Sequence, residues 1–149
     1  MNTLSLFDGM SCGKIVLNSL GVHGTYYASE IDTFAIAEST VNHPDIIRLG
    51  DVLNWREWDI DFSSIDLLIG GSPCQGFSSA GLNKGFSDPR SNLFFSYVDV
   101  LNHIKSLNPN VMFLLENVKM KKEYMDVITS NLGVDPVFIN ASDFTAQSR

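Results

Sequence analysis

Short apolar segments alternate with helix-like segments along the whole chain, and this alternation narrows the possible folds more than any other feature. Apolar runs at residues 3–7, 25–29 and 65–69 each stop at Gly, Asp or Glu. Continuous apolar strands separated by helices are typical of a mostly parallel sheet with helices on both faces. The length of 149 residues is that of one domain, so we predict a single α/β domain at residues 1–149.

Hydrophobic periodicity and turn signals assign the individual elements. Asp32 is a predicted N-cap, and Gly21 and the sequence Asn-His-Pro at 42–44 end the helices before them. The run at 111–115 has no polar interruption and is expected to form a fully buried strand. Strands are predicted at residues 3–7, 25–29, 46–49, 65–69, 111–115 and 136–140, and helices at 15–20, 33–41, 91–107 and 121–132.

Acidic residues, glycines and a Pro-Cys pair lie where the predicted strands end. Because ligands of open parallel sheets bind outside the carboxyl ends of the strands, these positions form the predicted binding edge of the sheet. The residues concerned are Asp8 and Gly9, Glu30, Asp51, Pro73 and Cys74, and Glu116.

Three of these strand ends favour an adenosine pocket. Gly9 and Gly13, in the sequence FDGMSCG at 7–13, can adopt positive φ and let a ligand approach the backbone. Glu30 can accept hydrogen bonds from ribose hydroxyls, and Asp51 can hold the exocyclic amine of adenine. Neither a GxGxxG pattern nor a phosphate loop occurs, which favours a cationic, phosphate-free adenosine cofactor. The alternative is structural, with the acidic residues as turn formers or solvated strand ends.

Cys74 lies among Gly, Ser and Pro at residues 70–78, where a reactive thiol is more typical than a buried structural one. Residues 75–90 are rich in Gly and lack hydrophobic periodicity, which predicts a long loop that closes over a substrate. Glu116 is a candidate acid, and the alternative is an N-cap of the following helix. The three histidines are expected to be structural or solvated, which disfavours a thiol hydrolase.

Composition excludes several classes of protein. Cys12 and Cys74 lie far apart, without a CxxC pattern, so neither a disulfide framework nor a structural zinc site is expected. Seventeen acidic and ten basic residues give a net charge of −7, which is not typical of a nucleic-acid-binding domain. No signal peptide or membrane-spanning run is visible, so we interpret the protein as soluble and cytoplasmic.

The sequence GSPCQG at residues 71–76 resembles the catalytic motif of the DNA (cytosine-5) methyltransferases. The segment at residues 7–13 resembles the family's first motif. It differs from the commoner FxGxGG form, with Asp8 in place of a neutral residue and Ser11 and Cys12 in place of Gly, whereas Gly9 and Gly13 remain. Six further segments resemble motifs of this family, and all of them follow the family's order along the chain. They are residues 7–13, 29–32, 50–52, 90–94, 116–118 and 147–149.

This resemblance implies a Rossmann-like fold and an enzyme that transfers a methyl group from S-adenosylmethionine to C5 of cytosine, leaving S-adenosylhomocysteine, as in restriction–modification in a bacterial or phage-type host cell. It implies that Cys74 adds to C6 of a cytosine flipped out of double-stranded DNA, that Glu116 protonates N3 and that Arg149 binds the flipped nucleotide. No metal is implied. The residues implied around the cofactor are Phe7, Gly9, Gly13, Glu30, Ile31, Asp51, Val52, Pro73 and Leu93.

The resemblance stops at residues 147–149, so the second Arg of the family's QxRxR motif, the target-recognition region and the last two motifs are not included. We interpret the chain as the catalytic and cofactor-binding part of a truncated methyltransferase, either a fragment or one half of a split enzyme completed by a second polypeptide. Two alternatives stay open. One is a non-enzymatic, methyltransferase-like regulatory or partner-binding subunit, and the other is an S-adenosylmethionine-dependent enzyme for a small molecule or another nucleic acid.

Overall fold

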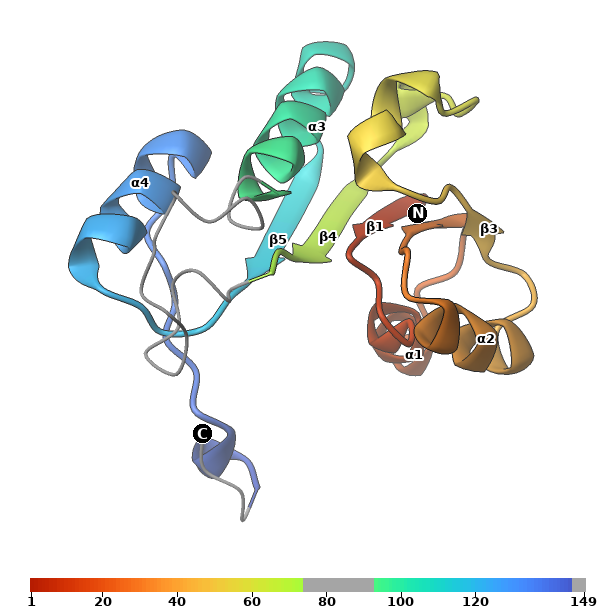
Figure 1. The fold of residues 1–149 in the computed structure, drawn as a ribbon, viewed down its shortest axis with the longest axis horizontal. Helices are drawn as coiled ribbons and strands as arrows, with labels where there is room; N and C mark the ends of the chain where they lie inside the picture. The colour runs from red at the N-terminus through yellow and green to blue at the C-terminus, as the bar shows by residue number, and fades with distance from the viewer. Residues whose placement is uncertain (74–92, 146–149) are drawn as a thin grey trace.

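A five-stranded parallel sheet forms the centre of the computed structural model, which describes residues 1–73 and 93–145 (Figure 1). The strands lie in the order β3-β2-β1-β4-β5, and each neighbouring pair is parallel. The strands are β1 (Thr3–Leu6), β2 (Tyr26–Ser29), β3 (Ile47–Arg48), β4 (Leu67–Gly71) and β5 (Met112–Glu116). The α-helices are α1 (Cys12–Ser19), α2 (Thr33–Asn42), α3 (Leu93–Leu107) and α4 (Lys122–Leu132).

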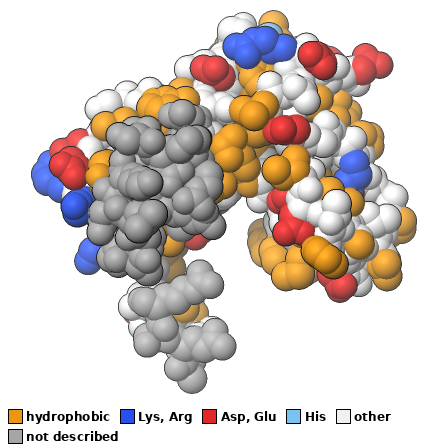
Figure 2. All heavy atoms as spheres, viewed as in Figure 1, with side chains coloured by type: hydrophobic (Ala, Val, Ile, Leu, Met, Phe, Trp, Pro, Cys, Tyr) orange, Lys and Arg blue, Asp and Glu red, His pale blue; other side chains and the backbone are white. Residues whose placement is uncertain are grey.

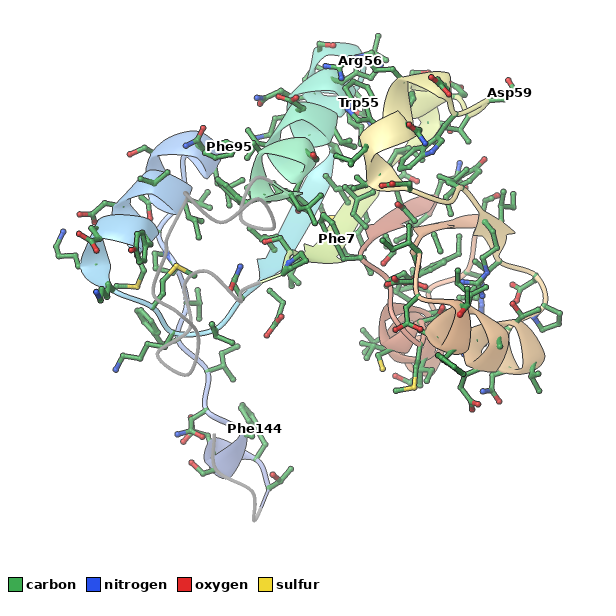
Figure 3. All side chains as sticks on the ribbon, viewed as in Figure 1. Phe7, Trp55, Arg56, Asp59, Phe95 and Phe144 are labelled. Carbon is green, nitrogen blue, oxygen red and sulfur yellow. The ribbon has the colours of Figure 1, made fainter. Side chains whose placement is uncertain are left out.

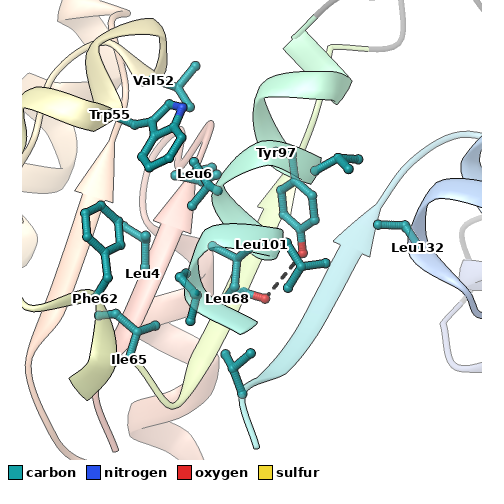
Figure 4. Close-up of a cluster of buried hydrophobic side chains, with 14 of the residues drawn as sticks. Leu4, Leu6, Val52, Trp55, Phe62, Ile65, Leu68, Tyr97, Leu101 and Leu132 are labelled. Carbon is teal, nitrogen blue, oxygen red and sulfur yellow. Dashed lines mark hydrogen bonds between the residues drawn. The ribbon is translucent and has the colours of Figure 1, made fainter. Parts of the chain in front are cut away.

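The main hydrophobic core lies between the sheet and α3 (Figure 4). Leu4 and Leu6 of β1 and Leu68 of β4 are completely buried there, together with Tyr97 and Leu101 of α3. The Tyr97 hydroxyl donates a hydrogen bond to the Leu68 carbonyl at 3.5 Å, and burial raises the pKa of this phenol. Each buried leucine contributes about 1.5–3 kcal/mol of transfer free energy, so this face dominates the stability of the domain.

A smaller core lies on the opposite face of the sheet, where Figure 1 shows α1 and α2. Tyr26 and Ala28 of β2 are buried there with Ile46, and Leu17 of α1 packs against them. Helices therefore cover both faces of a parallel sheet, which confirms the predicted α/β class and its Rossmann-like arrangement.

The predicted strand at residues 136–140 is wrong. These residues have no regular secondary structure, and the side chains of Val137 and Ile139 are 83% and 71% exposed. An extended segment becomes a strand only when its backbone groups pair with a neighbour, and β5 pairs with β4 alone among the described strands. The apolar sequence of this segment is therefore compatible with a strand, but no partner for it lies in the described part of the chain.

The strand β5 is only half buried, which corrects the prediction of a fully buried strand. Phe113 and Leu115 pack against the main core, whereas Met112 and Leu114 are 55% and 59% exposed. Successive side chains of a strand point to opposite faces, so the exposed pair lies on the face that α1 covers elsewhere. The described residues leave this face of β5 uncovered.

Several boundaries differ from the predicted ones by one to three residues. The strand β4 begins at Leu67 because a 3-10 helix, Phe62–Ser64, occupies the residues before it, with Asp61 as its N-cap. Further 3-10 helices form at Val52–Glu57 and Ala141–Asp143. None of the described helices combines the length and the apolar character needed to span a membrane. In the same part of the chain, His, Cys, Asp and Glu side chains form no group of three that could hold a metal ion.

Candidate functional site

The candidate site lies at the carboxyl ends of β1, β4 and β5, as the sequence predicts. A cavity of about 230 Å³ lies there, between the loop after β1 and the end of β5. Phe7, which follows β1 directly, is labelled in Figure 3 near the ends of β1 and β4. The residues that line the cavity are Ser5, Leu6, Phe7, Asp8, Cys12, Gly13, Ile69, Gly70, Gly71, Leu114 and Glu116.

The loop between β1 and α1 has an unusual backbone. Phe7, Gly9 and Ser11 all have positive φ, at 57°, 57° and 63°. Gly9 adopts the positive φ that the sequence predicts, and its missing side chain leaves open space, because a Cβ there would meet no atom within 4 Å. Phe7 and Ser11 adopt the same region at a cost of about 1–3 kcal/mol each. The surrounding structure must therefore hold this loop in place.

Gly13 does not adopt the positive φ that the sequence predicts. It stands in the first turn of α1, where a Cβ would overlap the end of the Ile69 side chain and lie 2.8 Å from the Tyr26 hydroxyl. The absence of a side chain thus lets α1 approach the sheet closely.

Glu30 holds the loop from the end of β2. Its Oε2 accepts a hydrogen bond from the Gly9 N–H at 2.8 Å, and its Oε1 accepts from the N–H groups of Ile31 and Asp32 at 2.8 and 2.9 Å. The carboxylate is half buried. Glu30 is therefore a structural part of the site rather than a solvated strand end, and its oxygens lie next to the backbone of Gly9.

Asp8 lines the candidate site at the predicted binding edge, although sequence reasoning assigned its carboxylate no role beyond that of a turn former. Its side chain is 1% exposed, Oδ1 accepts from the Tyr26 hydroxyl at 2.8 Å, and Oδ2 accepts from the Ser11 hydroxyl. The guanidinium of Arg48 lies 3.8 Å from Oδ2. Burial and the charge of Asp8 raise the pKa of Tyr26, which keeps its proton as the donor. The partners come from three separate segments, so no local pattern could indicate the cluster.

Asp51 lies after β3 and caps the 3-10 helix that follows, because its Oδ1 accepts from the Leu53 N–H at 2.9 Å. Val52 is buried in the main core, and Leu93 packs against that core from the first turn of α3. Ile31, directly after Glu30, is 66% exposed. Asp32 is the N-cap of α2, as predicted.

Glu116 is the last residue of β5 and is paired in register with Gly71 of β4. A Cβ on Gly71 would lie 3.1 Å from the Glu116 Oε2, so the glycine keeps space beside the carboxylate. The Glu116 carboxylate is exposed and accepts no hydrogen bond among the described residues. Glu116 is not a helix cap, because α4 begins at Lys122 and its N-cap is Lys121.

A side-chain hydrogen bond joins the ends of β4 and β5. The Asn117 Nδ2 donates to the Ser72 Oγ at 3.1 Å, and the Asn117 Oδ1 accepts from the Val118 N–H at 2.9 Å. Ser72 is buried, and Pro73 after it is half buried. This bond, which sequence reasoning missed, fixes the chain two residues before Cys74.

The structure brings some of the predicted site residues together and leaves others apart. Phe7, Gly13 and Glu116 line the cavity, and Gly9 and Glu30 meet in the loop beside it. Two predicted catalytic residues, Cys74 and Arg149, lie outside the described residues, as does the predicted loop at 75–90. The predicted cofactor residues that do not line the cavity are Gly9, Glu30, Ile31, Asp51, Val52, Pro73 and Leu93.

Comparison with protein families gives one match across almost the whole chain. The model of the family described as C-5 cytosine-specific DNA methylase matches residues 1–144.

Curated relatives are similar over most of this chain. The orphan methyltransferase M.Rho11sI of Bacillus phage rho11s is 39% identical over 122 residues, which cover 80% of this chain and 23% of that protein. The type II methyltransferase M.SsoII of Shigella sonnei is 38% identical over 116 residues, covering 78% of this chain and 29% of the relative. The chain thus spans about a quarter of the length of the relatives it matches.

Solved structures share the fold. An Entamoeba histolytica methyltransferase, EhMeth, has a TM-score of 0.64 at 18% identity and is matched over 89% of this chain and 43% of its own. The S. pombe Dnmt2 methyltransferase has a TM-score of 0.55 at 20% identity, over 89% of this chain and 40% of its own. At these identities the likeness shows the common architecture.

Proposed function

Because the chain belongs to the C-5 cytosine-specific DNA methylase family, we propose that it is the catalytic and cofactor-binding part of an enzyme that methylates C5 of cytosine in DNA. The methyl donor in this proposal is S-adenosylmethionine, and the product is S-adenosylhomocysteine.

The arrangement at the ends of β4 and β5 carries this proposal. Glu116 presents to the cavity a carboxylate that accepts no hydrogen bond from the described residues, and the other wall of this cavity is the loop after β1. The bond between Asn117 and Ser72 ties this carboxylate to the segment that leads into Cys74. A carboxylic acid at this sheet edge, with a cysteine one residue after Pro73 in the sequence, suits nucleophilic attack with proton transfer to the same ring.

The chemistry of the described residues fits S-adenosylmethionine. The cofactor is cationic and has no phosphate, and the site offers the carboxylates of Glu30, Asp51 and Glu116 and no phosphate-binding loop. The left-handed Gly9 leaves open space above the backbone, as close approach of a ligand requires. We assign the cofactor to the residues implied by the family resemblance, with Glu30 at the ribose and Asp51 at the adenine.

In the proposed reaction the Cys74 thiolate adds to C6 of the cytosine while Glu116 donates a proton to N3. The ring thereby loses its aromaticity, and C5 becomes an enamine carbon that takes up a methyl group. S-adenosylmethionine supplies that group as an electrophile. Transfer of the C5 proton to a solvent water then expels the thiolate and re-forms the aromatic ring, and the N3 proton returns to the Glu116 carboxylate.

Double-stranded DNA with a flipped cytosine is the proposed partner, because C6 is inaccessible to a thiol inside a base-paired stack. The net charge of −7 is not typical of a surface that binds the DNA backbone. On the face in Figure 2, the Lys and Arg side chains of the described residues lie in separate groups. Arg149 is proposed to bind the flipped nucleotide. Target recognition is assigned to sequence beyond this chain, either in the same polypeptide or in a second one.

A covalent trap tests the function directly. The full-length protein is incubated with S-adenosylmethionine and a pool of duplexes in which 5-fluorocytosine replaces cytosine, because fluorine cannot leave from C5 as the proton does. We expect a denaturation-resistant complex whose mass is the sum of protein, DNA and one methyl group. The complex should disappear in Cys74→Ser.

Two results would contradict the proposal. An adduct that persists in Cys74→Ser would exclude the assigned nucleophile. Absence of any adduct, with full binding of S-adenosylhomocysteine, would favour the non-enzymatic alternative.

A further inference from the structure

We infer that Asp8 is a positioning residue, whose buried carboxylate holds residues 7–13 in the backbone conformation that the cofactor requires. Only the identity of the ligand rests on the proposed function, because the contacts that support the inference lie within the described chain. Asp8 also occupies the unspecified second position of the FxGxGG pattern, with a charged side chain in place of a neutral one.

The Asp8 carboxylate is removed from water but not left without partners. Hydroxyl groups of Tyr26 and Ser11 donate to its two oxygens, and Arg48 brings a positive charge to 3.8 Å. A buried carboxylate persists only when such groups replace its hydration. Tyr26 belongs to β2 and Arg48 to β3, so Asp8 fastens the loop to two neighbouring strands.

The loop needs fastening because its conformation is unfavourable in isolation. Phe7 and Ser11 have positive φ without being glycine. Asp8 lies between them, its N–H donates to the Ser29 carbonyl at 3.1 Å, and its carbonyl accepts from the Ser11 N–H at 3.0 Å. The side-chain contacts of Asp8 therefore act on the residue that links both strained positions.

Asp8 acts through the loop and not by contact with a ligand. Both of its oxygens are occupied, and its side chain is 1% exposed. Glu30 differs, because its carboxylate is only half buried while it holds the adjacent residue, Gly9. The Asp8 carboxylate thus anchors residue 8 of the loop, and the Glu30 carboxylate anchors residue 9. Of the two carboxylates, only that of Glu30 is exposed enough to contact a ligand.

Adjacent tyrosines supply a matched pair of variants. Tyr26→Phe removes the hydroxyl that donates to Asp8, whereas the hydroxyl of the half-buried Tyr27 makes no hydrogen bond among the described residues. Asp8→Asn keeps an acceptor for Tyr26, and Asp8→Ala removes it. The set therefore separates loss of the Asp8 contacts from loss of a tyrosine hydroxyl as such.

The first measurement is amide hydrogen exchange of the full-length protein without any cofactor. We expect exchange at Gly9 and Ser11 to rise at least tenfold in Tyr26→Phe and Asp8→Ala, to rise less in Asp8→Asn, and to stay within twofold in Tyr27→Phe. Unchanged exchange at both amides in Tyr26→Phe and Asp8→Ala would overturn the inference.

The second measurement is the dissociation constant of S-adenosylhomocysteine, determined by calorimetry where each variant is fully folded. We expect about a tenfold weaker complex for Tyr26→Phe, a larger loss for Asp8→Ala, and partial recovery in Asp8→Asn. A role in stability alone would leave this constant unchanged, because a folded majority binds normally. Equal affinities in all variants would overturn the positioning role. If the wild type does not bind S-adenosylhomocysteine, the proposed cofactor is wrong. The hydrogen-exchange measurement would then still show whether Asp8 holds the loop in its conformation.

Discussion

The two sides of the candidate site differ in how far the chain itself satisfies their polar groups. On the β1–β2 side, Asp8 accepts two hydrogen bonds and Glu30 accepts three. On the β4–β5 side, Glu116 accepts none among the described residues and is exposed. The first side is thus preorganised by internal contacts, whereas the second presents a carboxylate that is available to a substrate.

The sheet shows the same difference. All four residues of β1 are buried, whereas β5 exposes Met112 and Leu114 on one face. Apolar side chains exposed beside a cavity are typical of surfaces that other parts of a protein cover. We therefore expect substitutions on the β1–β2 side to change stability and cofactor binding together, and substitutions on the β4–β5 side to change catalysis with little effect on stability.

Glu116→Gln should have the largest effect. It removes the proposed acid, so methyl transfer in the full-length protein should fall by about 10²–10⁴-fold. The free energy of unfolding should change by less than about 0.5 kcal/mol, because the carboxylate that is lost is exposed and has no partner among the described residues. Steady-state transfer of labelled methyl groups and urea unfolding measure the two quantities.

Glu123→Gln provides the control for this variant, since Glu123 is exposed in the first turn of α4. It should leave the transfer rate unchanged. A destabilisation above about 2 kcal/mol in Glu116→Gln would show that this carboxylate stabilises the β4–β5 side. The two sides of the site would then not differ in the way their carboxylates are used.

Glu30→Gln tests the opposite side. The amide retains one acceptor but turns an NH₂ group toward backbone donors, so we expect a loss of about 1–3 kcal/mol of stability. The dissociation constant of S-adenosylhomocysteine should rise at least tenfold, because the Gly9 N–H loses its partner. Glu57→Gln, at an exposed carboxylate that accepts no hydrogen bond in the described part of the chain, should change neither quantity. Weaker binding without any loss of stability would mean that Glu30 contacts the ligand but does not hold the loop.

Much of the fold is predictable because its signals are local. The runs that form β1, β2 and β5 carry their own apolar residues and turn chemistry, and Asp32 caps α2 as its sequence indicates. The segment at 136–140 has the same local signals without forming a strand, because pairing depends on a neighbour that its own sequence does not contain.

The position of the candidate site in the fold was predictable from the sequence, but the contacts around Asp8 were not. Strand ends of a parallel sheet converge, so Glu30 and Glu116 could be assigned to one edge from their positions alone. The cluster around Asp8 could not, since the register of three strands brings Tyr26 and Arg48 to the loop. The sequence places Asp8 at the binding edge and indicates a turn there, but it does not indicate that the carboxylate is the centre of a buried network.

Ser72→Ala should have a moderate effect on the β4–β5 side. It removes the acceptor of the Asn117 amide, and loss of one partly buried hydrogen bond costs about 0.5–1.5 kcal/mol. The rate of adduct formation with 5-fluorocytosine DNA should fall several-fold, because the segment leading to Cys74 is less well fixed. Ser64→Ala, remote from the site, removes a hydroxyl that donates to the Asp61 carbonyl at 2.7 Å and serves as the control. An unchanged adduct rate in Ser72→Ala would indicate that the bond does not position the cysteine.

Asp45→Asn should have the smallest effect, at the outer edge of the β1–β2 side. Lys14 is buried on α1 and pairs with the exposed Asp45 at 2.8 Å, and the hydrogen bond from Lys14 is the main reason that the pKa of Asp45 lies below its ordinary value of 3.8. A carboxylate with a depressed pKa in the folded state stabilises the protein above its unfolded pKa, and this contribution disappears as the pH falls through the folded value.

Urea unfolding at pH 7 should therefore show Asp45→Asn to be less stable than the wild type by about 0.2–1 kcal/mol, the range of exposed pairs. The two proteins should become equally stable as the pH falls below the lowered pKa of Asp45. Asp59→Asn, at an exposed carboxylate labelled in Figure 3, should match the wild type at pH 7. A difference that persists at pH values below the lowered pKa of Asp45 would mean that Asp45 acts by packing and not by charge. The ion pair of Lys14 and Asp45 would then not belong to the internal contacts that stabilise the β1–β2 side.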